Sequence, residues 1–494
     1  MSEVTMKEIT AMSAMTVAEK IKAKELSVQE VVEAQLKAIK LREPLYNSYI
    51  TITENEAKEQ AIKVQGQIDN GELKDSPLAG VPVAIKDNIC TRGIKTTCAS
   101  KMLADFVPAY DATVTERLKK SGAILIGKVN LDEFAMGGTT KTSYFGETKN
   151  PWNRDHTPGG SSGGSSAAVA AEEAFISLGS DTGGSIRQPA AYCGLVGFKP
   201  TYGTVSRYGL IPLASSLDQI GPLGRNISDC ASILELISGY DPKDSTSIKQ
   251  GRYNYRSALV DDVKNMKIGV PKLYLDEDLD EDIRSCFLGA LKTFEDMGAK
   301  VELFDLDEIR HSVQAYYVIS CAEASSNLSR YDGVRYGHRT GDYDGLDELY
   351  KKSRGEGFGY EVKRRIMLGA YMLSSDKYEA YYNKARRIRT IISKTYDEAF
   401  NKYDILLSPE SPNTAPLLSD DYSSSKNKQK SEILNVSVNL AGLPAVSIPC
   451  GKDRKGLPIG LQLIGKKFGE KALIQAAYSF EQTRPYERPG TLVN

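Results

Sequence analysis

Short apolar runs alternate with helical segments along most of this 494-residue chain, and this alternation limits the folds open to it. Runs of this length, bounded by glycine, proline or charged residues, are typical of buried β-strands. Strands interleaved with helices build a largely parallel or mixed sheet, so we predict an α/β fold. The predicted strands are residues 81–85, 123–127, 175–179, 267–271, 301–306, 404–409, 445–450 and 459–465.

Helical segments lie before and between these runs. The capping-box spacing of Ser27 and Glu30 predicts a helix that runs to about residue 41, with Pro44 as its stop. Another helix is predicted at 54–68. Residues 418–431 are nearly devoid of apolar side chains and are predicted to form a surface loop.

Charge and cysteine content exclude several classes of protein. The chain has 63 Lys and Arg against 64 Asp and Glu, so no basic excess marks it as a nucleic-acid or membrane binder. Its seven cysteines are odd in number and lack a C-x-x-C pair, which argues against a disulfide framework or a zinc site. With no apolar segment near the N-terminus, we expect a cytoplasmic protein without a membrane span.

Two glycine- and serine-rich loops carry the strongest signal for chemistry. They are PGGSSGGSS at 158–166 and GSDTGGSIR at 179–187, and they place Ser161 and Ser185 24 residues apart. Ser185 follows a predicted strand and a glycine pair, where backbone N–H groups can converge on one point. Such a cluster stabilises negative charge on a carbonyl oxygen, so Ser185 is the candidate nucleophile of an acyl transfer.

A serine nucleophile needs a base near neutral pH. Only three histidines are present, and the one near these loops, His156, has no obvious carboxylate to orient it beyond the adjacent Asp155. Lys86 follows the apolar run VPVAI, where burial would lower its pKa and keep it uncharged. Ser161 would then pass the proton from Ser185 to Lys86.

Simpler interpretations compete with this one. A glycine-rich loop is more often a turn or an anion-binding nest, and a lysine after a strand is often a surface side chain. Gly159 and Gly164 match the opening of a phosphate-binding loop, but Ser165 occupies the position of its required lysine. A phosphate-loop nucleotidase is therefore disfavoured.

Lys86, the run GGSSGGS at 159–165 and DTGGSIR at 181–187 together resemble the amidase signature family. The resemblance implies a mixed β-sheet flanked by helices on both faces. It implies that Lys86 is the base, that Ser161 is a bridging serine on a cis peptide bond, and that Ser185 is the nucleophile. It also implies an oxyanion hole formed by backbone N–H groups of Thr182, Gly183, Gly184 and Ser185.

Within this family the chain is similar to the A subunits of tRNA-dependent amidotransferases, from about Leu26 to Gln482. The resemblance implies a glutaminase that passes ammonia to a partner subunit, where ATP and Mg²⁺ would activate a misacylated tRNA. It implies a heterotrimer with subunits B and C and no cofactor or metal in this chain. The matching segments include DEFAM (132–136), KPTYG (199–203), SRYGLI (206–211), SSLDQIG (215–221), DPKDSTS (241–247), NLAGLP (439–444) and GLPIGLQLIG (456–465).

The same similarity implies that Tyr316, Arg365 and Glu432 hold the α-carboxylate and α-amine of glutamine. Two departures are visible. Glu432 stands where the family usually has Asp, and GGTTKTS at 137–143, with Lys141 and Thr142, replaces the usual GSSTENS on the expected ammonia route.

We expect residues 1–494 to form a single amidase-signature domain, with its catalytic core at 80–230 and a helical cap at 310–400. Strands that can complete one sheet lie on both sides of every candidate linker. Two alternatives to the glutaminase stay open: a stand-alone amidase acting on other small amides, and a catalytically silent scaffold.

Overall fold

The computed structural model describes residues 5–251, 253–276, 279–420 and 426–492. The strands in this part of the chain are β1 Tyr49–Ile52, β2 Pro82–Lys86, β3 Ile124–Val129, β4 Ile176–Asp181, β5 Val196–Lys199, β6 Gln219–Gly224, β7 Lys267–Pro271, β8 Lys300–Phe304, β9 Ile405–Pro409, β10 Ala445–Lys452 and β11 Pro458–Gly465. They form one 11-stranded sheet in the order β1-β3-β2-β4-β6-β5-β10-β11-β9-β7-β8. Strand β2 is parallel to β3 and β4, and β7 is parallel to β8 and β9, whereas the other neighbours are antiparallel.

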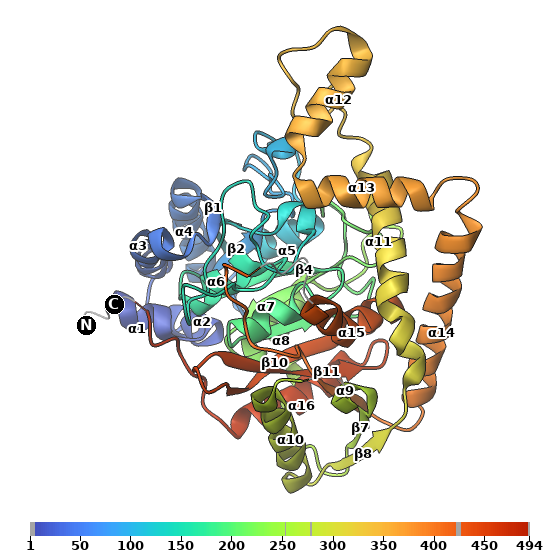
Figure 1. The fold of residues 1–494 in the computed structure, drawn as a ribbon. Helices are drawn as coiled ribbons and strands as arrows, with labels where there is room; N and C mark the ends of the chain where they lie inside the picture. Colours follow the sequence, from blue (N-terminus) through green and yellow to red (C-terminus); the bar gives the residue numbers. More distant parts are fainter. Residues whose placement is uncertain (1–4, 252, 277–278, 421–425, 493–494) are drawn as a thin grey trace.

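Helices cover both faces of this mixed sheet, which confirms the predicted fold (Figure 1). Helices α8, α10 and α16 pack on one face, and α6 and α7 pack on the other. The α-helices are α1 Met6–Ala11, α2 Ala14–Lys22, α3 Val28–Tyr46, α4 Glu54–Asp69, α5 Thr113–Lys120, α6 Gly163–Ala170, α7 Arg187–Tyr192, α8 Ile227–Ile237, α9 Leu273–Asp276, α10 Glu281–Asp296, α11 Ser312–Leu328, α12 Gly345–Gly357, α13 Tyr360–Met372, α14 Lys384–Ala399, α15 Lys426–Ala441 and α16 Glu470–Gln482.

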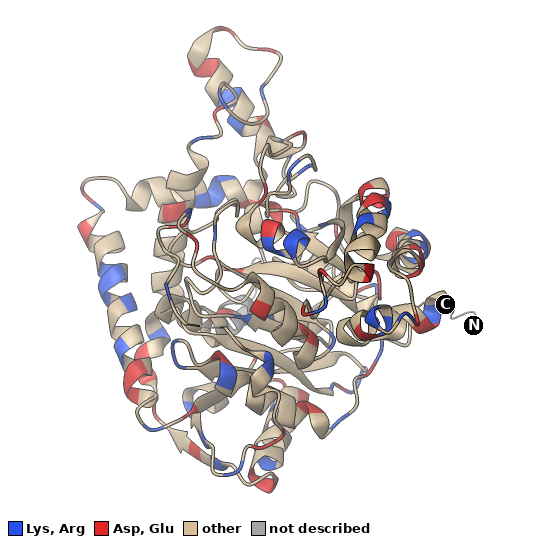
Figure 2. Ribbon diagram, turned by 180° about the vertical axis from the view of Figure 1, so that it is seen from behind, with Lys and Arg blue, Asp and Glu red and all other residues tan. Residues whose placement is uncertain are grey.

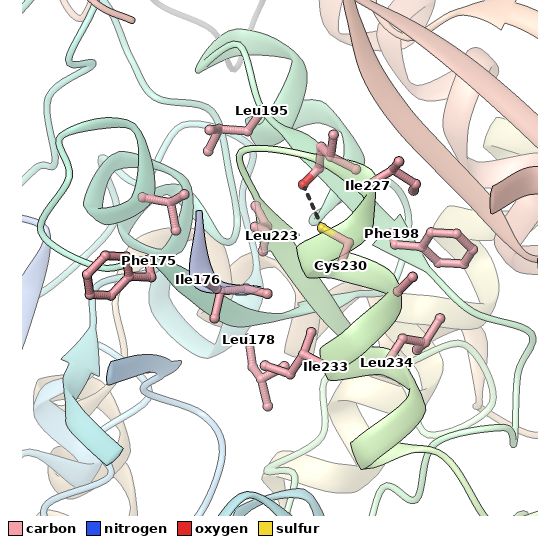
Figure 3. Close-up of a cluster of buried hydrophobic side chains, with 14 of the residues drawn as sticks. Phe175, Ile176, Leu178, Leu195, Phe198, Leu223, Ile227, Cys230, Ile233 and Leu234 are labelled. Carbon is pink, nitrogen blue, oxygen red and sulfur yellow. Dashed lines mark hydrogen bonds between the residues drawn. The ribbon is translucent and has the colours of Figure 1, made fainter. Parts of the chain in front are cut away.

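Strand β4, which leads to Ser185, is fixed by contacts on both of its faces. On one face Ile176 and Leu178 pack against α8, where they join Leu223 and Ile233 in a buried cluster (Figure 3). On the other face the hydroxyl of Ser177 donates to the carbonyl of Ser165 in α6, at 2.9 Å. The alternation of apolar and small polar residues along β4 therefore matches the two different layers that cover it.

Residues 310–400 contain helices α11, α12, α13 and α14 and a short π-helix, Glu379–Asn383. Helices α11, α13 and α14 stand together beside the sheet, and α12 projects from the body of the molecule (Figure 1). Both acidic and basic residues lie along the outer helices (Figure 2). Among the described residues, we find no helix with the length and apolarity that crossing a bilayer requires.

Two predicted boundaries were wrong. Helix α3 continues to Tyr46 and contains Pro44, because a proline in the last turn removes only one of its final hydrogen bonds. The predicted loop at 418–431 is helical from Lys426, where α15 begins, while residues 421–425 lie outside the described part. The segment from residue 432 onward supplies the apolar side chains that pack α15 against the core.

Candidate active site

Lys86 is the last residue of β2, and its side chain is fully buried. Its Nζ lies 2.7 Å from Ser161 Oγ, 2.8 Å from Ser162 Oγ and 3.2 Å from the carbonyl oxygen of Ser180. Burial lowers the pKa of Lys86 from 10.5 to about 7, against the opposing charge of Asp132. The amine is therefore available in its neutral form near physiological pH, as the sequence predicted.

The loop before α6 presents Ser161 to this amine. The peptide bond between Gly160 and Ser161 is cis, as the resemblance implied. The backbone N–H of Ser162 donates to the carbonyl of Ser185 at 3.1 Å, so the two serine loops lie against one another. The hydroxyl of Ser162 also lies 3.1 Å from the carbonyl of Ser180, which it shares with Lys86. Sequence reasoning did not single out Ser162, although it adjoins the predicted serine.

Ser185 lies between the end of β4 and the start of α7 and is 8% exposed. The carboxylate of Asp181 shapes this turn, because it accepts hydrogen bonds from the N–H groups of Gly184 (2.8 Å) and Ile186 (3.1 Å). Arg187 holds the same carboxylate through its Nε at 3.1 Å. The Gly184 N–H of the predicted oxyanion hole is thus engaged with Asp181.

Thr182 is anchored through its side chain, whose hydroxyl donates to Asp218 Oδ1 at 2.6 Å. Close packing explains the two glycines that follow it. A Cβ at Gly183 would lie 2.7 Å from the ring of Tyr316, and Gly184 has a φ of +115°. The turn therefore tolerates no side chain at either position without rearrangement.

A pocket beside this turn gathers residues from six separate segments of the chain. It contains Ser185 together with Tyr316, Arg365 and Glu432, which α11, α13 and α15 contribute. The sequence-predicted nucleophile and substrate-binding residues thus meet in one place. The lining residues are Ala135, Gly137, Gly138, Gly160, Gly183, Gly184, Ser185, Gln188, Tyr316, Arg365, Glu432 and Asn435.

The pocket holds one cation and one anion, each bonded to a neighbouring side chain. Arg365 is 4% exposed and donates through Nε to Glu361 Oε1 at 2.8 Å. Glu432 Oε1 accepts a 2.7 Å hydrogen bond from the hydroxyl of Tyr317. Sequence reasoning missed Glu361 and Tyr317, because a glutamate in a charged helix and one of 27 tyrosines carry no distinguishing pattern.

The other predicted features lie apart from this pocket. His156 Nδ1 is 2.6 Å from the carbonyl oxygen of Ala415, so this histidine makes a hydrogen bond to a distant segment of the chain, after β9. Lys141 Nζ donates to the carbonyls of Leu418 and Asp420, and Thr142 donates to Asp132 Oδ1 at 2.9 Å. Among the described residues, no group of three or more His, Cys, Asp or Glu side chains is placed to hold a metal ion.

Known proteins resemble the chain over nearly its full length. The amidase family model matches residues 30–474. The A subunit of the glutamyl-tRNA(Gln) amidotransferase from Lachnoclostridium phytofermentans is 60% identical over 98% of this chain and 99% of its own length. The protein of that name from Caldanaerobacter subterraneus is 50% identical over 97% and 98%.

Solved structures agree with the sequence matches. The crystal structure of the glutamyl-tRNA(Gln) amidotransferase A subunit from Thermotoga maritima has 39% identity and a TM-score of 0.79, and covers 99% of this chain and 97% of its own. A bacterial aryl acylamidase of the amidase signature family has 26% identity and a TM-score of 0.85, covering 96% of each chain. The sheet order, the serine loops and these full-length matches lead to one assignment: the chain belongs to the amidase family.

Proposed function

We propose that this chain is the glutaminase subunit of a tRNA-dependent amidotransferase, which hydrolyses glutamine to supply ammonia. One observation carries the proposal: the pocket beside Ser185 also contains a buried cation, Arg365, and an acidic side chain, Glu432. An amide substrate that bears both a carboxylate and an ammonium group matches this pair. Glutamine is such an amide, and the full-length relatives are named as subunits of an enzyme of that kind.

In the proposed mechanism, neutral Lys86 accepts a proton through Ser161 as Ser185 attacks the side-chain amide. The 2.7 Å contact between Lys86 and Ser161 supports the first part of this path, and the packing of the two serine loops supports the second. The proton returns to the leaving nitrogen and ammonia departs, leaving a glutamyl ester on Ser185. Water then cleaves the ester by the same proton path.

Charge on the substrate oxygen would be stabilised by backbone N–H groups of the turn at residues 182–185. Because Gly184 donates to Asp181, the N–H groups of Thr182, Gly183 and Ser185 are the donors we assign to the oxyanion hole. Arg365 would bind the α-carboxylate through its terminal nitrogens, with Tyr316 beside it, and Glu432 would bind the α-ammonium.

The ammonia would serve a partner subunit that uses ATP and Mg²⁺ to convert misacylated Glu-tRNA(Gln), or both this and Asp-tRNA(Asn), to the amidated form. We propose subunits B and C as the partners, in a cytoplasmic heterotrimer. The proposal includes a single amidase-signature domain over residues 1–494, with a core at 80–230 and a cap at 310–400. Support comes from the one sheet, whose described strands run from Tyr49 to Gly465.

The test is a glutaminase assay on the purified chain, repeated after the partner subunits are added. We expect slow hydrolysis by the isolated chain, stimulation by the partners, and loss of activity in Ser185→Ala. Labelling of Ser185 by a fluorophosphonate should disappear in Lys86→Ala. Retained hydrolysis by the assembled Ser185→Ala complex would refute the mechanism.

A stand-alone amidase acting on other small amides is the second candidate, because the aryl acylamidase fold matches this one closely. That function predicts rapid turnover of aryl amides by the isolated chain and no gain from partners. The charged pair in the pocket disfavours it, since an uncharged aryl amide carries no group that would bind to Arg365 or Glu432.

A further inference from the structure

Tyr317 contacts both charged groups of the pocket without lining the pocket itself. It follows Tyr316 on α11, and its hydroxyl donates to Glu432 Oε1 at 2.7 Å. The guanidinium of Arg365 lies over its ring, 5.7 Å from the centroid, a distance typical of cation–π contact. One side chain therefore touches the cation through its face and the anion through its hydroxyl.

These contacts are compatible with substrate binding by both charged groups. A carboxylate can accept several hydrogen bonds, so Glu432 can hold Tyr317 and an ammonium group together. Arg365 uses Nε toward Glu361, which directs the two terminal nitrogens of its planar fork away from that partner. Each charge is thus held in place by a neighbouring side chain, Arg365 by Glu361 and Glu432 by Tyr317.

Glu432 needs such an anchor more than a shorter side chain would. Glutamate has one more rotatable bond than aspartate, and holding it in one orientation costs conformational entropy when the substrate binds. A hydrogen bond made before binding removes part of that cost, because the carboxylate is already oriented. Tyr317 provides this bond from a different helix, so the position of Glu432 is set by the packing of α11 against α15.

We propose that Tyr317 is a positioning residue that determines specificity for an α-amino acid amide. It fixes Glu432 for the substrate ammonium through its hydroxyl and supports Arg365 for the carboxylate through its ring. This inference rests on the proposed glutaminase function and deepens it. It predicts that recognition of the substrate ammonium and recognition of its carboxylate can be separated. Removing the Tyr317 hydroxyl should affect the first, and removing its ring should also affect the second.

The experiment measures kcat and KM of the full chain, assembled with its partner subunits, for three amides. They are L-glutamine, 4-carbamoylbutanoate, which lacks the ammonium group, and 4-aminobutanamide, which lacks the carboxylate. Tyr317→Phe should raise KM for glutamine roughly 10-fold with kcat within about twofold, because a hydrogen bond to a charged group is lost. Its kcat/KM for 4-carbamoylbutanoate should not change, so the preference for glutamine over this analogue falls roughly 10-fold.

Removing the ring of Tyr317 tests its second contact, the one with Arg365. Tyr317→Leu should also weaken hydrolysis of 4-carbamoylbutanoate, because the support of Arg365 is lost. In a Glu432→Gln background, Tyr317→Phe should add no further effect, since the hydroxyl acts through the charge of Glu432. Tyr331→Phe is the matched control: this buried tyrosine packs against Phe134 with its ring centroid 5.5 Å away and should leave all three substrates unchanged.

Several results would overturn the inference. One is an unchanged preference of Tyr317→Phe for glutamine over 4-carbamoylbutanoate. Another is an equal loss of kcat/KM for all three amides in Tyr317→Phe, which would indicate a purely structural role. Thermal unfolding and fluorophosphonate labelling of Ser185 distinguish such a loss from misfolding. A wild-type complex that hydrolyses 4-carbamoylbutanoate as efficiently as glutamine would instead refute the proposed function. An unchanged preference in Tyr317→Phe alone would refute only the role of Tyr317.

Discussion

Burial of one amine sets the pH range of the proposed chemistry. The pKa of Lys86 is lowered from 10.5 to about 7 by burial, so a base at this position is increasingly protonated below neutral pH. We expect kcat/KM for glutamine to fall about 10-fold per pH unit below about 7, since only the neutral amine accepts a proton. A pH profile whose acidic limb has its midpoint near 10 would contradict this assignment.

The same shift has a consequence for stability. Between about pH 7 and 10.5 the unfolded chain carries a proton on Lys86 that the folded chain does not. The contribution of this group to the free energy of unfolding therefore rises with pH across that window and is constant below it. Comparing the pH dependence of urea unfolding for the wild type and Lys86→Met isolates the contribution.

Gly184 offers a test of the turn that holds Ser185, the proposed nucleophile. In Gly184→Ala, the new Cβ would lie 2.8 Å from Asn435 and the backbone would keep an unfavourable φ of +115°. We expect the rate of Ser185 labelling by a fluorophosphonate to fall at least ~100-fold, because displaced donors stabilise the oxyanion less well. Gly456→Ala, with a φ of +82° and nothing within 4 Å of the added Cβ, should strain its own turn and leave labelling unchanged.

Among single residues, the sequence predicted those that lie in loops or strands with a distinctive composition. Ser161 and Ser185 lie in glycine-rich segments whose composition restricts their backbone, and Lys86 ends an apolar strand. Tyr317, Glu361 and the role of Asp181 depend on contacts between helices or across a turn. Such contacts follow from tertiary packing, which no local pattern records.

Among the elements, α13 connects helix packing to the substrate recognition that we propose for Arg365. A Cβ at Gly369 would lie 2.0 Å from the carbonyl oxygen of Cys321 in α11, so the two helices meet here by backbone contact. In Gly369→Ala, α13 must move and carry Arg365 with it. We expect a KM for glutamine at least ~10-fold higher and a lower melting temperature.

Gly289→Ala is the matched helical control, because nothing lies within 4 Å of the added Cβ in α10. Alanine is favoured over glycine in a helix by about 0.5–1 kcal/mol, so this variant should be slightly more stable and have an unchanged KM. If both variants gave the same KM, the link between helix packing and Arg365 would be wrong.

All eight predicted apolar runs coincide with strands, because each combines β-branched or leucine residues with flanking turn signals. Three strands were missed. Strands β5 (VGFK) and β6 (QIGPLG) contain glycine or proline, and β1 (YITI) has only four residues. These segments form strands because they pair with neighbouring strands in the sheet. This pairing outweighs their weak local preference for the extended conformation.

Across the whole molecule, a buried charge network joins parts of the chain that are far apart in sequence. Arg187 pairs with Asp181, donates to Asn439 Oδ1 at 2.6 Å and contacts Gln462, so it links the nucleophile turn to α15 and β11. Despite burial, Asp181 raises the pKa of Arg187, and the pair stays charged. The order of the strands that brings these groups together was not predictable from the linear sequence.

Arg187→Met should lower the free energy of unfolding by about 3–5 kcal/mol, because it leaves Asp181 buried without its counter-charge. Urea denaturation followed by circular dichroism measures the change. Arg454→Met removes ion pairs with Glu281 and Asp282 from a side chain that is 73% exposed, and should change stability by less than about 0.5 kcal/mol. Equal losses of unfolding free energy in the two variants would show that the buried network contributes no more to stability than a surface ion pair.

In the proposed mechanism the site draws on two parts of the chain: the reactive groups come from residues 86–185, and the side chains that would meet the rest of the substrate come from α11, α13 and α15. Side chains on these three helices can therefore change while the residues proposed to react stay the same. Such an arrangement is compatible with the finding that an aryl acylamidase and an amidotransferase subunit both resemble this chain in fold. Substitutions in these three helices are therefore the first choice for changing which amide the site accepts.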